Sequence, residues 1–274
     1  MVTSRGASTT FRMNNTKRIL VTGSAGRVGR AAVAALVARG HTVIGFDVRP
    51  TPGVPAAQSI VGTLTDAAAL RAAATGADCI IHLAATPDDA TYPRAAPPND
   101  TDNFLDGLVP NNVIGPYQIM EAARVLKTPR VVLASTGQVV TGQLLEDKGP
   151  VPTDAPFRPR YLYACTKVFL EALGQVYSRE HGIGVLMVRL GWCPRDLGQV
   201  AEIEAMELGQ DVFLSPGDAG SFFAATVEVP TLPPYAVVYA ASNFTHRPRY
   251  DLAPSKALLG WEPRDKWPTG AKEF

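Results

Sequence analysis

The sequence predicts an α/β fold, in which a doubly wound parallel sheet with helices on both faces is followed by a small C-terminal lobe. The first observation is that short apolar runs alternate with segments of helical pattern between Arg18 and Val188. The second is a glycine-rich turn between the first strand and the first helix. The third is that the alternation stops after Gly191, where proline, glycine and aromatic residues become frequent.

Each element is predicted from a local pattern. Short apolar runs indicate buried parallel strands, and longer segments with apolar residues at helical spacing indicate helices. The predicted strands are residues 18–21, 42–46, 59–61, 79–83, 131–133 and 185–188. The predicted helices are residues 28–39, 66–74, a segment that ends at 124, and 161–177. Residues 86–101 are rich in proline, aspartate and asparagine and are predicted to form a surface loop.

Composition narrows the class of partner. The chain has 274 residues, 46% of them hydrophobic and 19% charged, which is ordinary for a globular protein. Because 26 basic residues face 25 acidic ones, we expect no nucleic acid partner. Charged residues interrupt every apolar run, so we expect no membrane span either. A small molecule is the expected partner.

The cysteines indicate a compartment. The chain has three cysteines, an odd number, and none of them forms a C-x-x-C pair. This pattern argues against a disulfide framework and against a zinc site, so we expect no metal and a reducing, cytoplasmic location. Residues 1–16 are interpreted as a disordered extension, because they lack an apolar signal sequence. A mitochondrial targeting segment is the alternative, since this stretch holds arginines and no acid.

The glycine-rich turn, Thr22 to Gly29, lies where a phosphate-binding loop would lie. Its three glycines would allow a tight turn and close approach of a pyrophosphate to the helix N-terminus, although glycine also serves as a simple turn former. Asp47 ends the second strand, where a carboxylate can accept both ribose hydroxyls of an adenosine and repel a 2′-phosphate. We therefore expect a Rossmann-type fold that binds NAD, with Arg49 as the residue that could admit NADP.

Tyr163 and Lys167 are the expected proton-transfer groups. They lie four residues apart on a predicted helix and so project from one face. A nearby ammonium group can lower the pKa of a phenol, which makes the phenolate a usable base. Tyr-x-x-x-Lys is common by chance, but here it follows a strand that ends in two hydroxyl residues, Ser135 and Thr136.

From Lys17 to about Pro263 the sequence resembles the extended short-chain dehydrogenase/reductases, also called the NAD-dependent epimerase/dehydratase family. The likeness is carried by Thr22–Gly29, His82–Ala85, Asn112 with Gly115 and Glu121–Ala123, Tyr163 with Lys167, and Leu258–Pro263. The resemblance implies a catalytic set of Tyr163, Lys167, Thr136 and Ser135. It implies cofactor contacts at Gly23, Ala25, Gly26, Arg27, Val28, Gly29, Asp47, Leu64, Leu83, Ala84, Ala85, Asn112 and Lys167.

Within this family the chain is most similar to the uronate dehydrogenases. The similar segments are Arg158-Pro159, Val188–Gly191 with Cys193, Phe213–Ser215 and Tyr239–Asn243. The resemblance implies oxidation of the C1 hydroxyl of a cyclic hexuronate and a homodimeric state. Substrate contacts are expected at Thr86, Gln138 and Arg195, the last as a bidentate clamp for a carboxylate. The chain departs from that group at Thr136-Gly137-Gln138, in a longer stretch from Trp192 to Val212, and at Thr63, which replaces an expected aspartate.

The sequence therefore predicts an NAD-binding domain over residues 17–190 and a small substrate-binding lobe with the C-terminal segment over 191–274. The favoured function is an NAD-dependent dehydrogenase acting on a sugar acid or a similar polyol. One alternative is a nucleotide-sugar epimerase or reductase of the same family, which would need a larger lobe for its nucleotide. The other is a non-enzymatic redox sensor that binds NAD(P), although a sensor has no need for the Tyr163–Lys167 pair.

Overall fold

The computed structural model of the protein describes residues 16–87, 103–146 and 149–274. Within these residues, seven parallel strands form one sheet in the order β3-β2-β1-β4-β5-β6-β7. The strands are β1 Arg18–Thr22, β2 Thr42–Asp47, β3 Ser59–Val61, β4 Cys79–His82, β5 Arg130–Thr136, β6 Gly184–Leu190 and β7 Tyr235–Ala240. The predicted doubly wound parallel sheet is confirmed, because the strand order reverses between β1 and β4.

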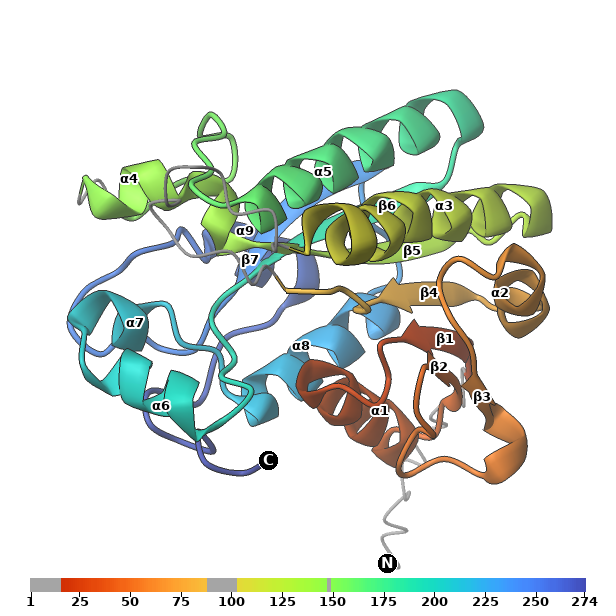
Figure 1. Cartoon of the computed structure of the whole chain (residues 1–274), viewed down its shortest axis with the longest axis horizontal. Helices are drawn as coiled ribbons and strands as arrows, with labels where there is room; N and C mark the ends of the chain where they lie inside the picture. Colours follow the sequence, from red (N-terminus) through yellow and green to blue (C-terminus); the bar gives the residue numbers. More distant parts are fainter. Residues whose placement is uncertain (1–15, 88–102, 147–148) are drawn as a thin grey trace, which may run out of the picture.

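Helices cover both faces of this sheet (Figure 1). The long helices are α1 Arg27–Ala38, α3 Gly115–Leu126, α5 Leu162–His181 and α8 Pro216–Glu228. The short ones are η1 Ala56–Gln58, α2 Ala67–Ala74, η3 Gly137–Val140, α4 Thr141–Leu145, α6 Leu197–Glu204, α7 Glu207–Asp211 and α9 Ala253–Leu259, and η2 Phe104–Ile114 is a π-helix. Helices α1 and α8 lie on one face, and α2, α3 and α5 lie on the other.

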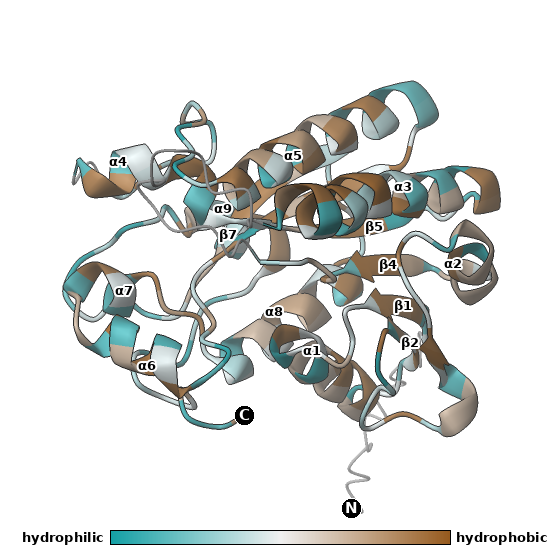
Figure 2. Ribbon diagram, viewed as in Figure 1, coloured by the Kyte–Doolittle hydropathy of each residue, from teal (hydrophilic) through white to brown (hydrophobic). Residues whose placement is uncertain are grey.

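The core consists of two apolar layers, one on each face of the sheet, and the strands alternate their side chains between them. Leu20 and Ile80 point toward α2, α3 and α5, whereas Val21 and Ile81 point toward α1 and α8. Figure 2 shows the hydrophobic residues concentrated on the strands and on the helix faces turned to them. Both faces are covered, which explains why these strands are almost continuously apolar in sequence.

The sheet extends beyond the predicted boundary at residue 190. Strand β7 pairs with β6 along its whole length, from Val185–Tyr235 to Leu190–Ala240. Helix α8 packs so closely on α1 that a Cβ atom at Gly220 would lie 2.7 Å from the carbonyl oxygen of Ala31. The prolines just before β7 interrupt the pattern of alternating strands and helices, so α8 and β7 were not predicted from the sequence as a further part of the sheet layer. Residues of the expected lobe therefore split between the sheet layer, residues 216–240, and the region above the strand ends.

A buried carboxylate organises this region above the strand ends. Asp211, at the end of α7, accepts hydrogen bonds from the backbone N–H groups of Thr245 and His246 through Oδ1, at 3.1 and 2.7 Å. Its Oδ2 pairs with Arg249 Nε at 3.0 Å. These contacts join residues 207–211 to residues 245–249 and so hold two separate chain segments as one small lobe over the carboxyl ends of the strands.

Two predictions from the sequence concern residues that lie largely outside the described part of the chain. Except for Thr16, the expected extension over residues 1–16 lies outside the described residues, as does most of the expected loop over 86–101. Among the helices that the structure describes, none is long and apolar enough to cross a membrane.

Candidate active site

The glycine-rich loop is folded tightly against the end of β4. Gly23 has φ +70°, and a Cβ atom there would lie 2.5 Å from the backbone nitrogen of Ala84. A Cβ atom at Gly29 would lie 2.0 Å from the carbonyl oxygen of Gly23. Helix α1 then begins after Gly26 with no side-chain cap and no acid in its first turn. Its N-terminus thus presents uncapped N–H groups, which suit a pyrophosphate.

Asp47 and Arg49 lie beside this loop. Asp47 Oδ2 accepts a hydrogen bond from the Ala25 backbone N–H at 3.0 Å, and Oδ1 accepts one from the Arg49 N–H at 3.1 Å. The Arg49 guanidinium reaches back to the Ala25 carbonyl oxygen at 3.3 Å. Each carboxylate oxygen retains a lone pair for a ribose hydroxyl. The residues present therefore fit the adenosine end of NAD.

The other predicted cofactor residues lie at or near the same edge of the sheet, and some of them act as supports. The Asn112 side chain donates to the Thr86 carbonyl oxygen and accepts from its N–H, both at 2.8 Å, so it fixes the segment after β4. Leu64 is buried under Gly115, where a Cβ atom would lie 2.8 Å from its side chain. Leu83, Ala84 and Ala85 continue from β4 beside the glycine loop, and Val28 packs into the α1 layer.

His82 is a buried structural residue. Its Nδ1 lies 2.7 Å from Thr22 Oγ1, which joins the ends of β4 and β1. Burial, with a further contribution from the charge of Lys167, lowers the pKa of His82 to about 3, so the imidazole is neutral. His82 therefore acts as a hydrogen-bonded core residue and not as a proton-transfer group.

Tyr163 and Lys167 project from the first turns of α5 toward the end of β5. The Lys167 Nζ lies 5.5 Å from the centre of the Tyr163 ring and donates to the Ala134 carbonyl oxygen at 2.8 Å. Tyr163 is partly buried, and Lys167 is 3% exposed. The Thr166 hydroxyl donates to the Tyr163 carbonyl oxygen at 2.7 Å and fixes this turn. The predicted pair is thus assembled on one helix face.

The electrostatics of the pair differ from the expectation. Burial raises the pKa of Tyr163 to about 12, and it is the charge of Arg195, not of Lys167, that opposes this rise. Burial also lowers the pKa of Lys167 to about 8. Removal of water from both side chains disfavours both charged forms in the protein alone. Arg195 is nevertheless close enough for its charge to act on the phenol.

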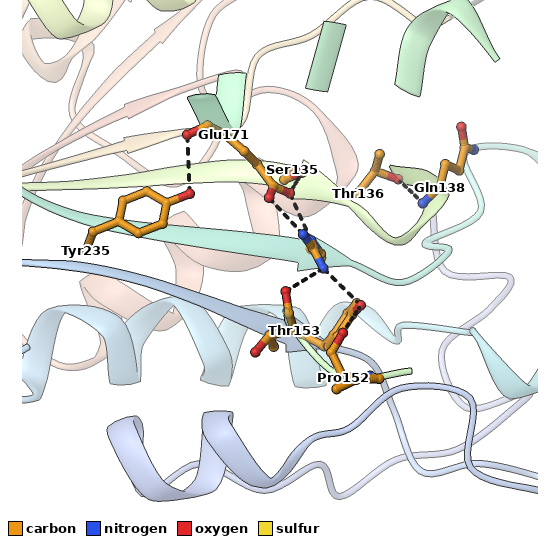
Figure 3. A network of polar contacts seen from close by, with 9 residues as sticks. Ser135, Thr136, Gln138, Pro152, Thr153, Glu171 and Tyr235 are labelled. Carbon is orange, nitrogen blue, oxygen red and sulfur yellow. Dashed lines mark hydrogen bonds and ion pairs between the residues drawn. The ribbon is translucent and has the colours of Figure 1, made fainter. Parts of the chain in front are cut away.

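The two predicted hydroxyl residues have different environments. Ser135 Oγ donates to Glu171 Oε1 at 2.6 Å inside the core, so its proton is not available to hydrogen-bond a substrate. Thr136 Oγ1 accepts from the Gln138 N–H at 3.2 Å, and its own proton has no acceptor among the described residues. Figure 3 shows Ser135 turned toward Glu171 and Thr136 beside Gln138. Thr136 is therefore the hydroxyl with a donor available at the end of β5.

A buried ion pair beneath these residues was not predicted from the sequence. Glu171 lies one helical turn beyond Lys167, and its two carboxylate oxygens accept from Arg189 Nε and Nη2, both at 2.9 Å (Figure 3). Arg189 also donates to the Thr153 carbonyl oxygen at 3.0 Å and to Tyr239 Oη at 3.1 Å. An arginine inside an otherwise apolar strand was the available signal, since a buried charge requires a partner.

The predicted substrate residues lie near this end of the sheet. Gln138 is exposed between buried neighbours, and the Thr86 hydroxyl accepts from Asn111 Nδ2 at 2.8 Å. The exposed Arg195 precedes α6, and its backbone N–H donates to Gln199 Oε1 at 2.9 Å. Cys165 and Cys193 are unpaired, as is Cys79. No cluster of metal-binding side chains occurs in the part of the chain that the structure describes.

A glycine-rich loop at a helix N-terminus, a carboxylate at the end of the next strand and a Tyr-Lys pair at one sheet edge are the arrangement expected of a dinucleotide-dependent oxidoreductase. Comparison with known proteins agrees with this class. The model of the NAD dependent epimerase/dehydratase family matches residues 19–192, and the chain belongs to this family. An L-arabinose 1-dehydrogenase (NAD(P)(+)) from Haloferax volcanii is 35% identical, with 90% of this chain and 96% of that protein covered.

Two further relatives extend the comparison. An NAD-dependent glucose-6-phosphate dehydrogenase from the same organism is 29% identical over 90% of this chain and 93% of its own. Among solved structures, a mutant uronate dehydrogenase from Agrobacterium tumefaciens complexed with NAD superposes with a TM-score of 0.70 at 26% identity, covering 91% of this chain and 85% of that one. The protein is an NAD-dependent oxidoreductase, as the sequence predicted.

The burial of Lys167 leads to a prediction on stability and pH. The folded pKa of about 8 lies below the ordinary value of 10.5, so the charged form destabilises the fold most below pH 8. This cost is relieved as pH rises from about 8 to 10.5, because the folded state then binds fewer protons than the unfolded state. We expect Lys167→Met to be about 3 kcal/mol more stable than wild type at pH 7 and to lose most of this advantage by pH 10. Urea denaturation of both proteins at pH 7 and pH 10 measures the difference in their free energies of unfolding. The same difference at both pH values would contradict the prediction.

Proposed function

We propose that this enzyme oxidises the C1 hydroxyl of a cyclic sugar and that hexuronates are its preferred class of substrate. The observation that carries the choice of class is the place of Arg195, an exposed arginine just before α6, whose charge also acts on the Tyr163 phenol. A cation that acts on the catalytic phenol is also near enough to pair with a carboxylate elsewhere on a sugar ring that fills the site. The likeness of the fold to uronate dehydrogenase supports this proposal.

In this proposal Tyr163 is the base. It takes the proton of the C1 hydroxyl, while Thr136 donates a hydrogen bond to the same oxygen and orients it. When bound, NAD would supply the hydride acceptor for C1. Lys167 holds the nicotinamide ribose, and the charge of Arg195, with that of the oxidised ring, favours the phenolate form of Tyr163. The C1 carbon thus loses a hydride and its oxygen loses a proton, which leaves a lactone.

A neutral aldose is the second candidate. It is supported by the 35% identity to L-arabinose 1-dehydrogenase over 90% of this chain. Arg195 is exposed, so water can satisfy its guanidinium when no carboxylate is bound. In this case the chemistry at C1 is unchanged, and only the contact with the far side of the sugar differs.

Arg195→Ala separates the two candidates. A bidentate guanidinium contact contributes about 1.5 to 3 kcal/mol. We therefore expect the substitution to raise KM for glucuronate and galacturonate about tenfold to a hundredfold, with little change for glucose, galactose or arabinose. Arg179→Ala is the matched control, because Arg179 is an exposed arginine at the far end of α5. Equal changes for acidic and neutral sugars would exclude the clamp.

A substrate screen tests the proposal as a whole. NAD reduction is measured with hexuronates, neutral aldoses, simple alcohols and nucleotide sugars at equal concentration. We expect the highest kcat/KM with a hexuronate. A preference for neutral aldoses would select the second candidate, and turnover of nucleotide sugars alone would favour the epimerase or reductase alternative.

We further propose that the protein forms a homodimer, as expected from the family resemblance, and that α3 and α5 form its interface. These two helices lie side by side on one face of the molecule (Figure 1). They expose large apolar side chains, namely Tyr117, Val125, Phe169 and Val176, each between 38% and 49% exposed. Light scattering should give twice the chain mass of 29.1 kDa, and Val176→Glu should lower it. A wild-type mass of one chain would contradict this.

A cytoplasmic location is also proposed. The three cysteines are unpaired, which suits a reducing compartment. Fractionation of the natural host cells tests the location, and recovery of the protein in a secreted or membrane fraction would contradict it.

A further inference from the structure

Arg27 connects the glycine loop to the end of the chain. It is the first residue of α1, immediately after the N-cap Gly26. Its Nη2 donates to the carbonyl oxygens of Gly270 and Ala271, at 2.7 and 2.9 Å. Its guanidinium carbon lies 4.3 Å from the ring centre of Phe274, the last residue, in a cation–π contact. The C-terminal residues thus fix the orientation of a cation at the start of the cofactor loop.

Two hydrogen-bond donors of the Arg27 guanidinium are left unsatisfied within the protein. The Nε and Nη1 atoms of Arg27 are buried and have no hydrogen-bond partner among the described residues. The Cys193 thiol lies close enough to Arg27 for a side-chain contact and for its charge to act, but burial dominates and raises the pKa of Cys193 to about 11. The sulfur is therefore neutral and a weak acceptor that does not satisfy the two donors. Buried unpaired donors on a cation are costly, and an anion would satisfy both donors and charge.

The segment that holds Arg27 is itself anchored in the small lobe. Ala271 is 1% exposed and lies in an apolar cluster with Val200 and Ile203 of α6 and with Phe213. Trp267 meets the Phe213 ring edge to face, with centroids 5.2 Å apart. Figure 1 shows the C terminus close to α6. The last residues therefore touch the lobe on one side and the glycine loop on the other.

We propose that residues 270–274 are part of the cofactor site, because they hold Arg27 so that its Nε and Nη1 donate to the cofactor's pyrophosphate. This proposal rests on the assignment of the glycine loop to NAD. Two backbone carbonyls and a ring orient the guanidinium without neutralising it, so its positive charge remains for the ligand. Through this segment the packing of the substrate lobe also affects the affinity for the cofactor.

Binding measured by calorimetry, with no sugar and no turnover, tests the proposal. The probes are NAD, ADP-ribose and adenosine, of which only the first two carry a pyrophosphate. The variants are Arg27→Met, Phe274→Ala, the double variant, and a chain ending at Thr269. Arg30→Met is the matched control, because Arg30 is an exposed arginine on the next turn of α1. Phe274→Ala guards against loss of folding in the shortened chain.

We expect Arg27→Met to weaken binding of NAD and ADP-ribose about tenfold to a hundredfold and to leave adenosine unchanged. Phe274→Ala should weaken NAD binding about twofold to fivefold in the wild type and have no effect in the Arg27→Met background. The shortened chain should lose as much as Arg27→Met or less. Wild-type affinity in Arg27→Met, equal loss in Arg30→Met, or an unchanged effect of Phe274→Ala without Arg27 would overturn the proposal. A wild type that binds adenosine but not NAD would overturn the cofactor assignment as well.

Discussion

Tyr163→Phe is expected to reduce kcat by a factor of at least about a hundred while the Kd for NAD stays within about twofold of wild type. The substitution removes only the phenolic oxygen, and a positioned acid–base group contributes roughly 10²- to 10⁴-fold to a rate. The phenol lies on the same helix face as Lys167, whose Nζ is 5.5 Å from the ring centre. Initial rates of NADH formation give kcat, and calorimetry gives the Kd.

The control for this experiment is Tyr117→Phe, because Tyr117 is an exposed tyrosine on α3, away from the end of β5. It should keep wild-type kcat. Turnover of more than a few per cent of wild type in Tyr163→Phe would show that another group takes the proton. A large loss of NAD affinity in the same variant would instead indicate that the phenol holds the cofactor.

The second large effect is expected on stability. Glu171→Ala should lower the free energy of unfolding by about 3 to 5 kcal/mol, because it leaves the Arg189 guanidinium buried without its carboxylate. Glu171 is 1% exposed and Arg189 2% exposed, so water cannot replace the lost partner. The Ser135 hydroxyl loses its acceptor at the same time (Figure 3). Urea denaturation of the variant and the wild type at pH 7 measures the difference.

A double variant provides the control for this prediction. Glu171→Leu with Arg189→Met replaces both charges by apolar side chains of similar size, and such replacements of buried ion pairs are often close to neutral. We expect it to recover most of the stability lost in Glu171→Ala. A loss below 1 kcal/mol in the single variant, or a double variant less stable than the single one, would contradict the interpretation of the pair as mutually dependent charges.

Sequence patterns were sufficient to predict those features of the fold that depend on residues close together in the chain. Six strands, the glycine turn and the Tyr163–Lys167 spacing each depend on neighbouring residues, and the structure has them within a few positions. The seventh strand was missed because the prolines before Tyr235 interrupt the alternation, although β6 supplies its partner in space. Only the sheet as a whole indicates where β7 belongs.

The candidate site shows the same limit. Three features of the site depend on contacts between distant segments of the chain. They are the hydrogen bond from Ser135 to Glu171, the effect of the Arg195 charge on Tyr163, and the hydrogen bonds from Arg27 to the carbonyl oxygens of residues 270 and 271. No spacing in the sequence encodes such contacts. The expected effect of Lys167 on the tyrosine failed for a related reason, since the extent of burial that dominates both pKa values is a property of the folded chain.

The central claim is that the enzyme oxidises C1 of a free cyclic sugar. The most direct measurement follows NADH and sugar products together in one reaction with the best substrate from the screen. We expect one lactone to form for each NADH, and we expect Tyr163→Phe to form neither product at an appreciable rate. An epimerised sugar without net NADH, or NADH formed together with an open-chain product oxidised at another carbon, would contradict it.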